Sequence, residues 1–369
     1  MQFQAPFRSA PTTSKSTQPR YFASIRSASA LSAAFLLAAT VGCGSGALGT
    51  QAVPPQNVAS PIASAKGPQL GYIWTSTDKT LRPILGVSGA SQVGQSVVPA
   101  GVYVGAATSA TASIAVLQDS DGAFDLMTLP SGSPASLGLT LPTGALIRIS
   151  PAASTALIYT AGASSASLVT GLLSTPAVHT ITAPGAISDS AVSDTGTTSF
   201  AYAQGSSFSI AAVALNGTAV PVASVKSLGG LNFLPGKDDL LFADATANSL
   251  TLMRSITSAP STSVIQTAQL LKTPSAVGIS GSGRWALVSN SGNQSLVRVD
   301  LTTLTSTSVA CSCTPTLATT LADDGAFRVT DSTSGPNWIV DAAPVTPRTL
   351  FIPALPATAK TSLIASVNP

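Results

Sequence analysis

The chain has 369 residues, enough for one large domain or two ordinary ones. Charged residues make up 8% against about 25% in ordinary globular proteins, while apolar residues reach 44%, and this balance excludes an intrinsically disordered chain. Four basic residues lie in the first 26 positions, and the rest of the chain has thirteen basic residues and fourteen Asp. This balance leaves no basic stripe that could bind a nucleic acid.

Residues 1–42 have the organisation of a secretory signal. Polar and basic residues come first, and an almost continuous apolar run from Ala30 to Gly42 follows. The run is shorter than the roughly 20 residues needed to span a bilayer. We therefore expect the segment to be cleaved and the protein to be exported.

Cys43 directly follows this apolar run. The sequence Val41-Gly42-Cys43-Gly44 resembles the bacterial lipobox, although Thr40 stands where that family usually has Leu. The resemblance implies lipidation of Cys43 and a place in the bacterial cell envelope, either outer-membrane-anchored or periplasmic. The alternative is a conventional signal peptide with an incidental cysteine. Residues 43–60, rich in Gly, Ala, Pro and Gln, predict a flexible tether.

Residues 61–369 contain a repeat with a period of about 40 to 47 residues, the length of a four-stranded propeller blade. Each unit has a turn at the corresponding position, and these turns lie near Ser76, Ser120, Gly162, Gly205, Ala245, Gly292 and Ser334. One sheet cannot bury both of its faces alone, whereas radial stacking lets each sheet cover its neighbour. The period predicts an all-β, seven-bladed β-propeller of four-stranded antiparallel blades.

The residues within each unit agree with this arrangement. There is no Glu in the chain, and the abundance of Ser, Thr and Val favours strands over helices. The predicted inner strands carry small residues, as in Ser190-Ala191-Val192 and Val277-Gly278-Ile279, because blades lie closest together near the axis. Larger residues, as in Phe200-Ala201-Tyr202, belong to the second strand. A barrel or a sandwich is the alternative all-β fold.

The unit from Ala286 to Asp300 contains Val-Ser-Asn-Ser-Gly-Asn followed by Val-Arg-Val-Asp. It resembles the repeat of bacterial propellers named for a Tyr-Val-Thr-Asn motif, which are similar in turn to lactonase-like and quinoprotein propellers. The resemblance implies a seven-bladed, exported propeller and says little about activity.

Five carboxylates fall in or beside the repeated turn of their units, on one expected face of the disc: Asp78, Asp119, Asp121, Asp244 and Asp331. A ring of carboxylates could bind a cation such as calcium, or a basic or polyhydroxylated ligand. The alternative is ordinary turn chemistry, in which Asp accepts hydrogen bonds from its own backbone. No other cofactor is expected.

Arg148 and Asn232 occupy the same register of their inner strands, where other units have Ala191, Gly278 and Thr320. Polar side chains at this position either reach the axial channel and meet a ligand, or pair within the core.

Two further features are weaker candidates for a functional site. His179 is the only histidine, which excludes a multi-histidine metal site. Cys311 and Cys313 could form a local disulfide or remain free thiols, and they supply only half of a zinc site.

The sequence therefore predicts a non-enzymatic binding or scaffold propeller, monomeric and held at the membrane by its lipid alone, with a protein or glycan ligand. A lactonase-like hydrolase with a cation at the channel mouth is one alternative, and a structural surface or adhesion protein is another.

Overall fold

The computed structural model describes residues 67–265, 269–331 and 336–354, and within them the regular secondary structure is entirely β-strand. These residues belong to one unit that begins at Ala63. The predicted signal segment, Cys43 and the predicted tether lie outside the described residues. In the described part of the chain, no helix is long and apolar enough to cross a membrane.

Seven antiparallel sheets follow one another along the chain, and in each the strands are paired in sequence order. We call these sheets blades 1 to 7. Blade 1 contains β1 (Gln69–Thr75), β2 (Thr80–Val87) and β3 (Ala90–Val93); blade 2 contains β4 (Tyr103–Thr108), β5 (Ile114–Asp119), β6 (Ala123–Thr128) and β7 (Ala135–Thr140). Blade 3 contains β8 (Leu146–Ile149), β9 (Thr155–Tyr159), β10 (Ser165–Thr170) and β11 (Ala177–Thr182); blade 4 contains β12 (Ile187–Val192), β13 (Thr198–Gln204), β14 (Ser207–Val213) and β15 (Ala219–Val225).

Blades 5 to 7 have four strands each, like blades 2 to 4. Blade 5 contains β16 (Leu228–Phe233), β17 (Leu240–Asp244), β18 (Ser249–Arg254) and β19 (Ser261–Ile265); blade 6 contains β20 (Pro274–Ile279), β21 (Trp285–Asn290), β22 (Ser295–Asp300) and β23 (Thr305–Val309). Blade 7 contains β24 (Thr319–Thr320), β25 (Ala326–Arg328), β26 (Asn337–Asp341) and β27 (Arg348–Ile352).

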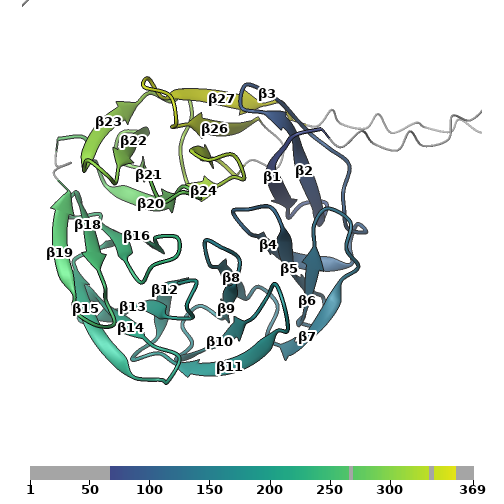
Figure 1. The fold of residues 1–369 in the computed structure, drawn as a ribbon, viewed down its shortest axis with the longest axis horizontal. Coiled ribbons are helices and arrows are strands. Elements are labelled where there is room, and N and C mark those ends of the chain that lie inside the picture. The colour runs from purple at the N-terminus through teal and green to yellow at the C-terminus, as the bar shows by residue number, and fades with distance from the viewer. Residues whose placement is uncertain (1–66, 266–268, 332–335, 355–369) are drawn as a thin grey trace, which may run out of the picture. The chain divides into compact units, whose positions relative to one another are not determined.

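The seven blades form a closed ring, with the first strands of blades 2 to 7 around the centre (Figure 1). The hydrophobic core is divided among seven clusters, each built from two neighbouring blades. One cluster joins the last blade to the first, where Leu321 and Ile339 pack with Leu70. The Ala322 amide also donates to the Leu70 carbonyl at 2.7 Å. The predicted seven-bladed β-propeller is confirmed.

A serine at the end of the inner strand fixes the following turn in four blades. Its hydroxyl accepts a backbone N–H from four or five residues ahead, which satisfies a donor that the turn would otherwise leave unpaired. The serine hydroxyls and the amides they bind are Ser109 with Ser113, Ser150 with Thr155, Ser193 with Thr197, and Ser280 with Trp285, each at 3.1 Å. This local interaction explains why the same turn recurs along the sequence.

The inner strands carry large buried residues at some positions, such as Tyr103 on β4 and Phe233 on β16, and small ones where two blades come closest. Tyr159 and Phe200, on second strands, are buried between blades. On the inner strand β20, by contrast, a Cβ at Gly278 would lie 3.1 Å from the Phe327 ring and closer still to the backbone of Ala318. The inner strands therefore need small residues where neighbouring backbones meet.

Blade 1 differs from the other blades in the described residues. The turn at Ser76 lies between its first two strands, β1 and β2, whereas the turns at Ser120, Gly162, Gly205, Ala245 and Gly292 each separate a second strand from a third. The residues predicted as a second strand, Tyr72 to Trp74, accordingly form β1. Three strands of this blade are described, and Ser334 of the seventh repeated turn lies outside the described residues.

Candidate functional site

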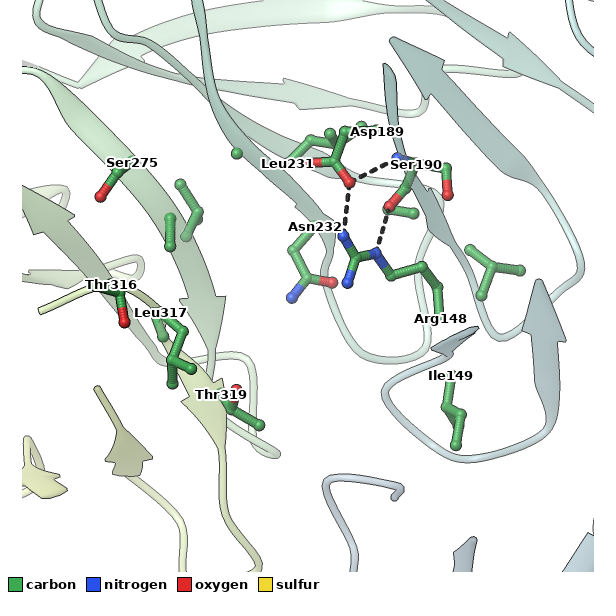
Figure 2. A pocket seen from close by; sticks show the side chains of 16 residues that line it. Arg148, Ile149, Asp189, Ser190, Leu231, Asn232, Ser275, Thr316, Leu317 and Thr319 are labelled. Carbon is green, nitrogen blue, oxygen red and sulfur yellow. Dashed lines mark hydrogen bonds and ion pairs between the residues drawn. The ribbon is translucent and has the colours of Figure 1, made fainter. Parts of the chain in front are cut away.

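The inner strands place Arg148 of β8 and Asp189 of β12 against each other at the centre of the ring. Arg148 Nη2 lies 2.7 Å from Asp189 Oδ1, and Arg148 Nε donates to the Ser190 carbonyl at 3.3 Å (Figure 2). The Arg148 side chain keeps 45% of its surface exposed and that of Asp189 keeps 23%, so the pair is open to a ligand. Burial alone would lower the pKa of Arg148, but the Asp189 carboxylate and Tyr159 outweigh it and raise the pKa, so Arg148 is a permanent cation.

These residues line an axial cavity of about 330 Å³. Its walls come from β8, β12, β16, β20 and the segment that leads into β24, and the polar side chains among them are Arg148, Asp189, Ser190, Asn232, Ser275, Thr316 and Thr319. Figure 2 shows Asn232 and Ser190 beside Arg148, and Ser275, Thr316 and Thr319 on the opposite side. The cavity is therefore lined by hydrogen-bonding groups from five blades.

A second cavity of about 170 Å³ adjoins the first. The two share Ile149, Asn232 and Thr319, and the second one extends to the turns that follow the inner strands, at Pro151 and Gly281. Since the inner strands of successive blades are equivalent, these cavities occupy successive levels of one axial passage. Asn232 stands at the boundary between them.

Two buried hydroxyls lie next to Arg148 without a hydrogen-bond partner among the described residues. They are Tyr159 Oη and Ser190 Oγ, each in a residue that is only 1% exposed. Burial raises the pKa of Tyr159, whereas Arg148 and Ser190 act in the opposite direction. Buried hydroxyls are normally satisfied by protein or by ordered water. Tyr159 Oη and Ser190 Oγ can therefore each form a further hydrogen bond with a ligand or a water molecule.

Arg148 and Asn232 were singled out by their register, and both line the axial cavity. Sequence reasoning missed Asp189, Ser275, Thr316 and Thr319. Asp189 lies two residues before Ala191, on the same side of the inner strand as the Arg148 position. Its equivalents are the small residues Gly230 and Ala276, and an acidic residue in that register is the signal that could have identified it.

Each of the five predicted carboxylates lies in or beside the turn of its own blade. Both oxygens of Asp244 accept backbone N–H groups, among them those of Lys226 and Thr246 at 2.9 Å, and Asp119 accepts the amides of Asp121 and Ala123 at 2.9 Å. The bonds to Thr246, Asp121 and Ala123 are turn interactions of the kind that the alternative explanation requires, while the bond from Lys226 ties Asp244 to the segment that leads into β16.

The other predicted carboxylates are paired or exposed. Asp331 lies 2.9 Å from Arg328, and the Asp121 side chain is exposed. Burial would raise the pKa of Asp78, but its hydrogen bonds to Thr80 and to Arg82, which lies 3.0 Å away, lower it overall. No group of three or more His, Cys, Asp or Glu side chains that could hold a metal occurs within residues 67–265, 269–331 and 336–354, and calcium binding stays a prediction.

The remaining candidates lie away from the axis. His179 is exposed on β11, where its Nε2 is 3.2 Å from Thr170 Oγ1. Cys311 and Cys313 form a disulfide with a Cα–Cα distance of 5.1 Å. Of the two states that the sequence allowed, the bonded one is present.

Comparison with known proteins identifies the fold alone. No family model and no curated protein matches the chain. A functionally unknown protein from Desulfotomaculum acetoxidans is 12% identical over 78% of this chain and 100% of its own, with a TM-score of 0.53. A streptogramin B lyase is 12% identical over 70% of this chain and 85% of its own, with a TM-score of 0.49. Virginiamycin B lyase from Staphylococcus aureus is 12% identical over 73% and 90%, with a TM-score of 0.45.

Proposed function

We propose that this chain is a non-enzymatic binding protein whose axial cavity takes a polyhydroxylated ligand, the end of a glycan. The observation that carries the proposal is the convergence of Arg148, Asp189 and Asn232 on one cavity. The Arg148 guanidinium and the Asn232 amide nitrogen donate hydrogen bonds, and Asp189 Oδ2 accepts them. Neighbouring sugar hydroxyls need donors and acceptors side by side, which these three groups supply.

The size of the cavity favours a glycan over a protein partner. About 330 Å³ is at the lower end of the range for small-molecule sites, roughly 300 to 1,000 Å³, and suits one or two sugar units. A specific protein interface needs roughly 800 Å² of surface on each partner. The polar groups Arg148, Asp189 and Asn232 lie inside the cavity, where a flat protein surface would not reach them.

The proposed setting is the bacterial cell envelope. It is supported by the signal-like residues 1–42 and by the resemblance of the residues around Cys43 to a lipobox. The similarity of the unit from Ala286 to Asp300 to the Tyr-Val-Thr-Asn repeat of exported propellers points the same way. We propose a monomer that is tethered by the lipid on Cys43 and binds a glycan within the envelope.

Binding of the purified mature chain to a library of fluorescent bacterial glycans tests this function. We expect at least one glycan to bind, and substitution Arg148→Ala or Asn232→Ala to weaken its binding by about tenfold or more, since each removes hydrogen bonds made inside the cavity. Arg254→Ala is the matched control, because Arg254 lies outside the cavity lining and faces Asp239 at 3.9 Å.

Two results would count against the proposal. One is a library in which no glycan binds. The other is a partner protein that binds equally well to the wild-type chain and to both cavity variants, which would place the working surface elsewhere on the disc.

A further inference from the structure

The hydrogen bonds of Arg148 leave one edge of its guanidinium free. Nε donates to the Ser190 carbonyl and Nη2 donates to Asp189, so the edge formed by Nε and Nη2 is occupied. Among the described residues, Nη1 and the second N–H of Nη2 form no hydrogen bond; Tyr159 Oη is near enough to help raise the pKa of Arg148 but is itself without a bonded partner. One N–H of Nη1 and the second N–H of Nη2 form the adjacent, outer edge, which presents two parallel donors, the arrangement that binds a carboxylate through both of its oxygens.

Donors exceed acceptors around this edge. Asn232 lies beside the guanidinium (Figure 2), and its Oδ1 is already used, because it accepts the Phe233 amide at 3.0 Å. Its Nδ2 therefore remains as a donor without an acceptor in the described part of the chain. Tyr159 Oη and Ser190 Oγ are buried hydroxyls that also lack partners there. Asp189 Oδ2 remains as an acceptor, and the two hydroxyls can donate or accept, but the N–H groups of Arg148 and Asn232 still outnumber it. A ligand that satisfies these N–H groups must bring acceptors, and a carboxylate brings nothing else.

Asp189 does not prevent an anion from binding. Its charge is compensated on the occupied edge of the guanidinium, and the bonds from Arg148 and from the Ser190 amide at 2.8 Å converge on Oδ1. Asp189 thereby fixes the Arg148 side chain in place, so that binding at the free edge costs little ordering of a long side chain.

We propose that the axial cavity selects a ligand with a carboxylate, held through both oxygens by the free edge of Arg148 and assisted by Asn232. This inference rests on the proposed glycan function and narrows its ligand to an acidic sugar. Asp189 is a positioning residue for Arg148 in this scheme.

The test compares sugars that differ only in the group of interest. D-glucuronate and D-glucose form one pair, and D-galacturonate and D-galactose form another; in each, a carboxylate replaces a hydroxymethyl group. We expect the wild-type chain to bind the acids about tenfold more tightly or better, because hydrogen bonds between charged groups are the stronger ones. Saturation-transfer NMR titrations of the whole mature chain give the dissociation constants.

Two variants locate the preference. Arg148→Lys keeps the charge but loses the fork, and is expected to remove most of the preference for acids. Asn232→Asp is nearly isosteric and sets a competing carboxylate beside the guanidinium, so it should abolish acid binding with a melting temperature close to that of the wild type. Arg254→Lys, away from the cavity, should leave the preference unchanged.

The possible failures are distinguishable. Equal binding of acidic and neutral sugars, with both lost in Arg148→Ala, would overturn the carboxylate inference and leave the glycan function in place. Acid binding that survives in both Arg148→Lys and Asn232→Asp would overturn the assignment to this edge. If neither these sugars nor any library glycan bound, the proposed function and the inference would fall together.

Discussion

Substitution Gly278→Ala probes the close approach of blades 6 and 7 near the axis. A Cβ on Gly278 would fall inside the contact distance of the Ala318 carbonyl oxygen, 3.0 Å from the Ala318 carbonyl carbon and 3.1 Å from Phe327 Cδ1. Since the nearest atoms belong to the backbone, no side-chain rotation can relieve the clash. Overpacking of this kind costs about 1–3 kcal/mol, and we expect the free energy of unfolding to fall by that amount.

Urea denaturation followed by tryptophan fluorescence measures the change, because Trp285 is buried in the same blade. Gly281→Ala is the matched control, three residues along the chain, where an added Cβ meets nothing within 4 Å. The control should be unchanged or stabilised by about 0.4–1 kcal/mol, through the smaller entropy of its unfolded chain. If both variants unfolded at the same urea concentration, the packing argument for small residues on inner strands would be refuted.

Two titrations test the electrostatics of buried side chains. Burial would raise the pKa of Asp300, but the amides of Thr302 and Thr303 and the Arg284 side chain lower it overall. Asp300 therefore stabilises the fold above its unfolded pKa of about 4. This contribution is lost as the pH falls through the lower pKa of the folded state. Asp300→Asn should therefore cost about 1 kcal/mol at pH 7 and flatten the acid limb of the stability curve, and an unchanged acid limb would contradict this assignment. Burial and the neighbouring Asp125 raise the pKa of Tyr103 to about 12, so its ultraviolet titration should lie well above the ordinary value, and Asp125→Asn should lower it only in part; a titration near 10 would show an exposed phenol.

The turn spacing was sufficient to predict the number of blades, because repeated turns are fixed by local bonds such as those of Asp119 to the Asp121 amide and of Asp244 to the Thr246 amide. The small inner positions followed from the same periodicity, as Gly278 shows. The repeat period did not predict the pairing of Arg148 with Asp189. The two residues belong to different blades, and Asp189 directly follows an irregularity in the β12–β13 register that no simple alternation predicts.

For the predicted ring of carboxylates, the repeat located the residues but not the hydrogen bonds of their side chains. Asp119 and Asp244 do lie at equivalent turns, as the repeat indicates. The sequence could not show that Oδ1 of each would be occupied by amides of its own turn. A position shared by several units therefore located the residues, while the direction of each side chain depended on bonds formed inside each turn.

The contact between Leu70 and Ala322 has a kinetic consequence. Pairing within a blade joins strands that are neighbours along the chain, so hairpins can assemble quickly and in any order. Joining the last blade to the first instead brings together residues from opposite ends of the described chain, and it carries the largest loop-closure entropy of any contact in the propeller. Closure of the circle should therefore be the slow, late event in folding, and its reopening the first step by which the native ring is lost.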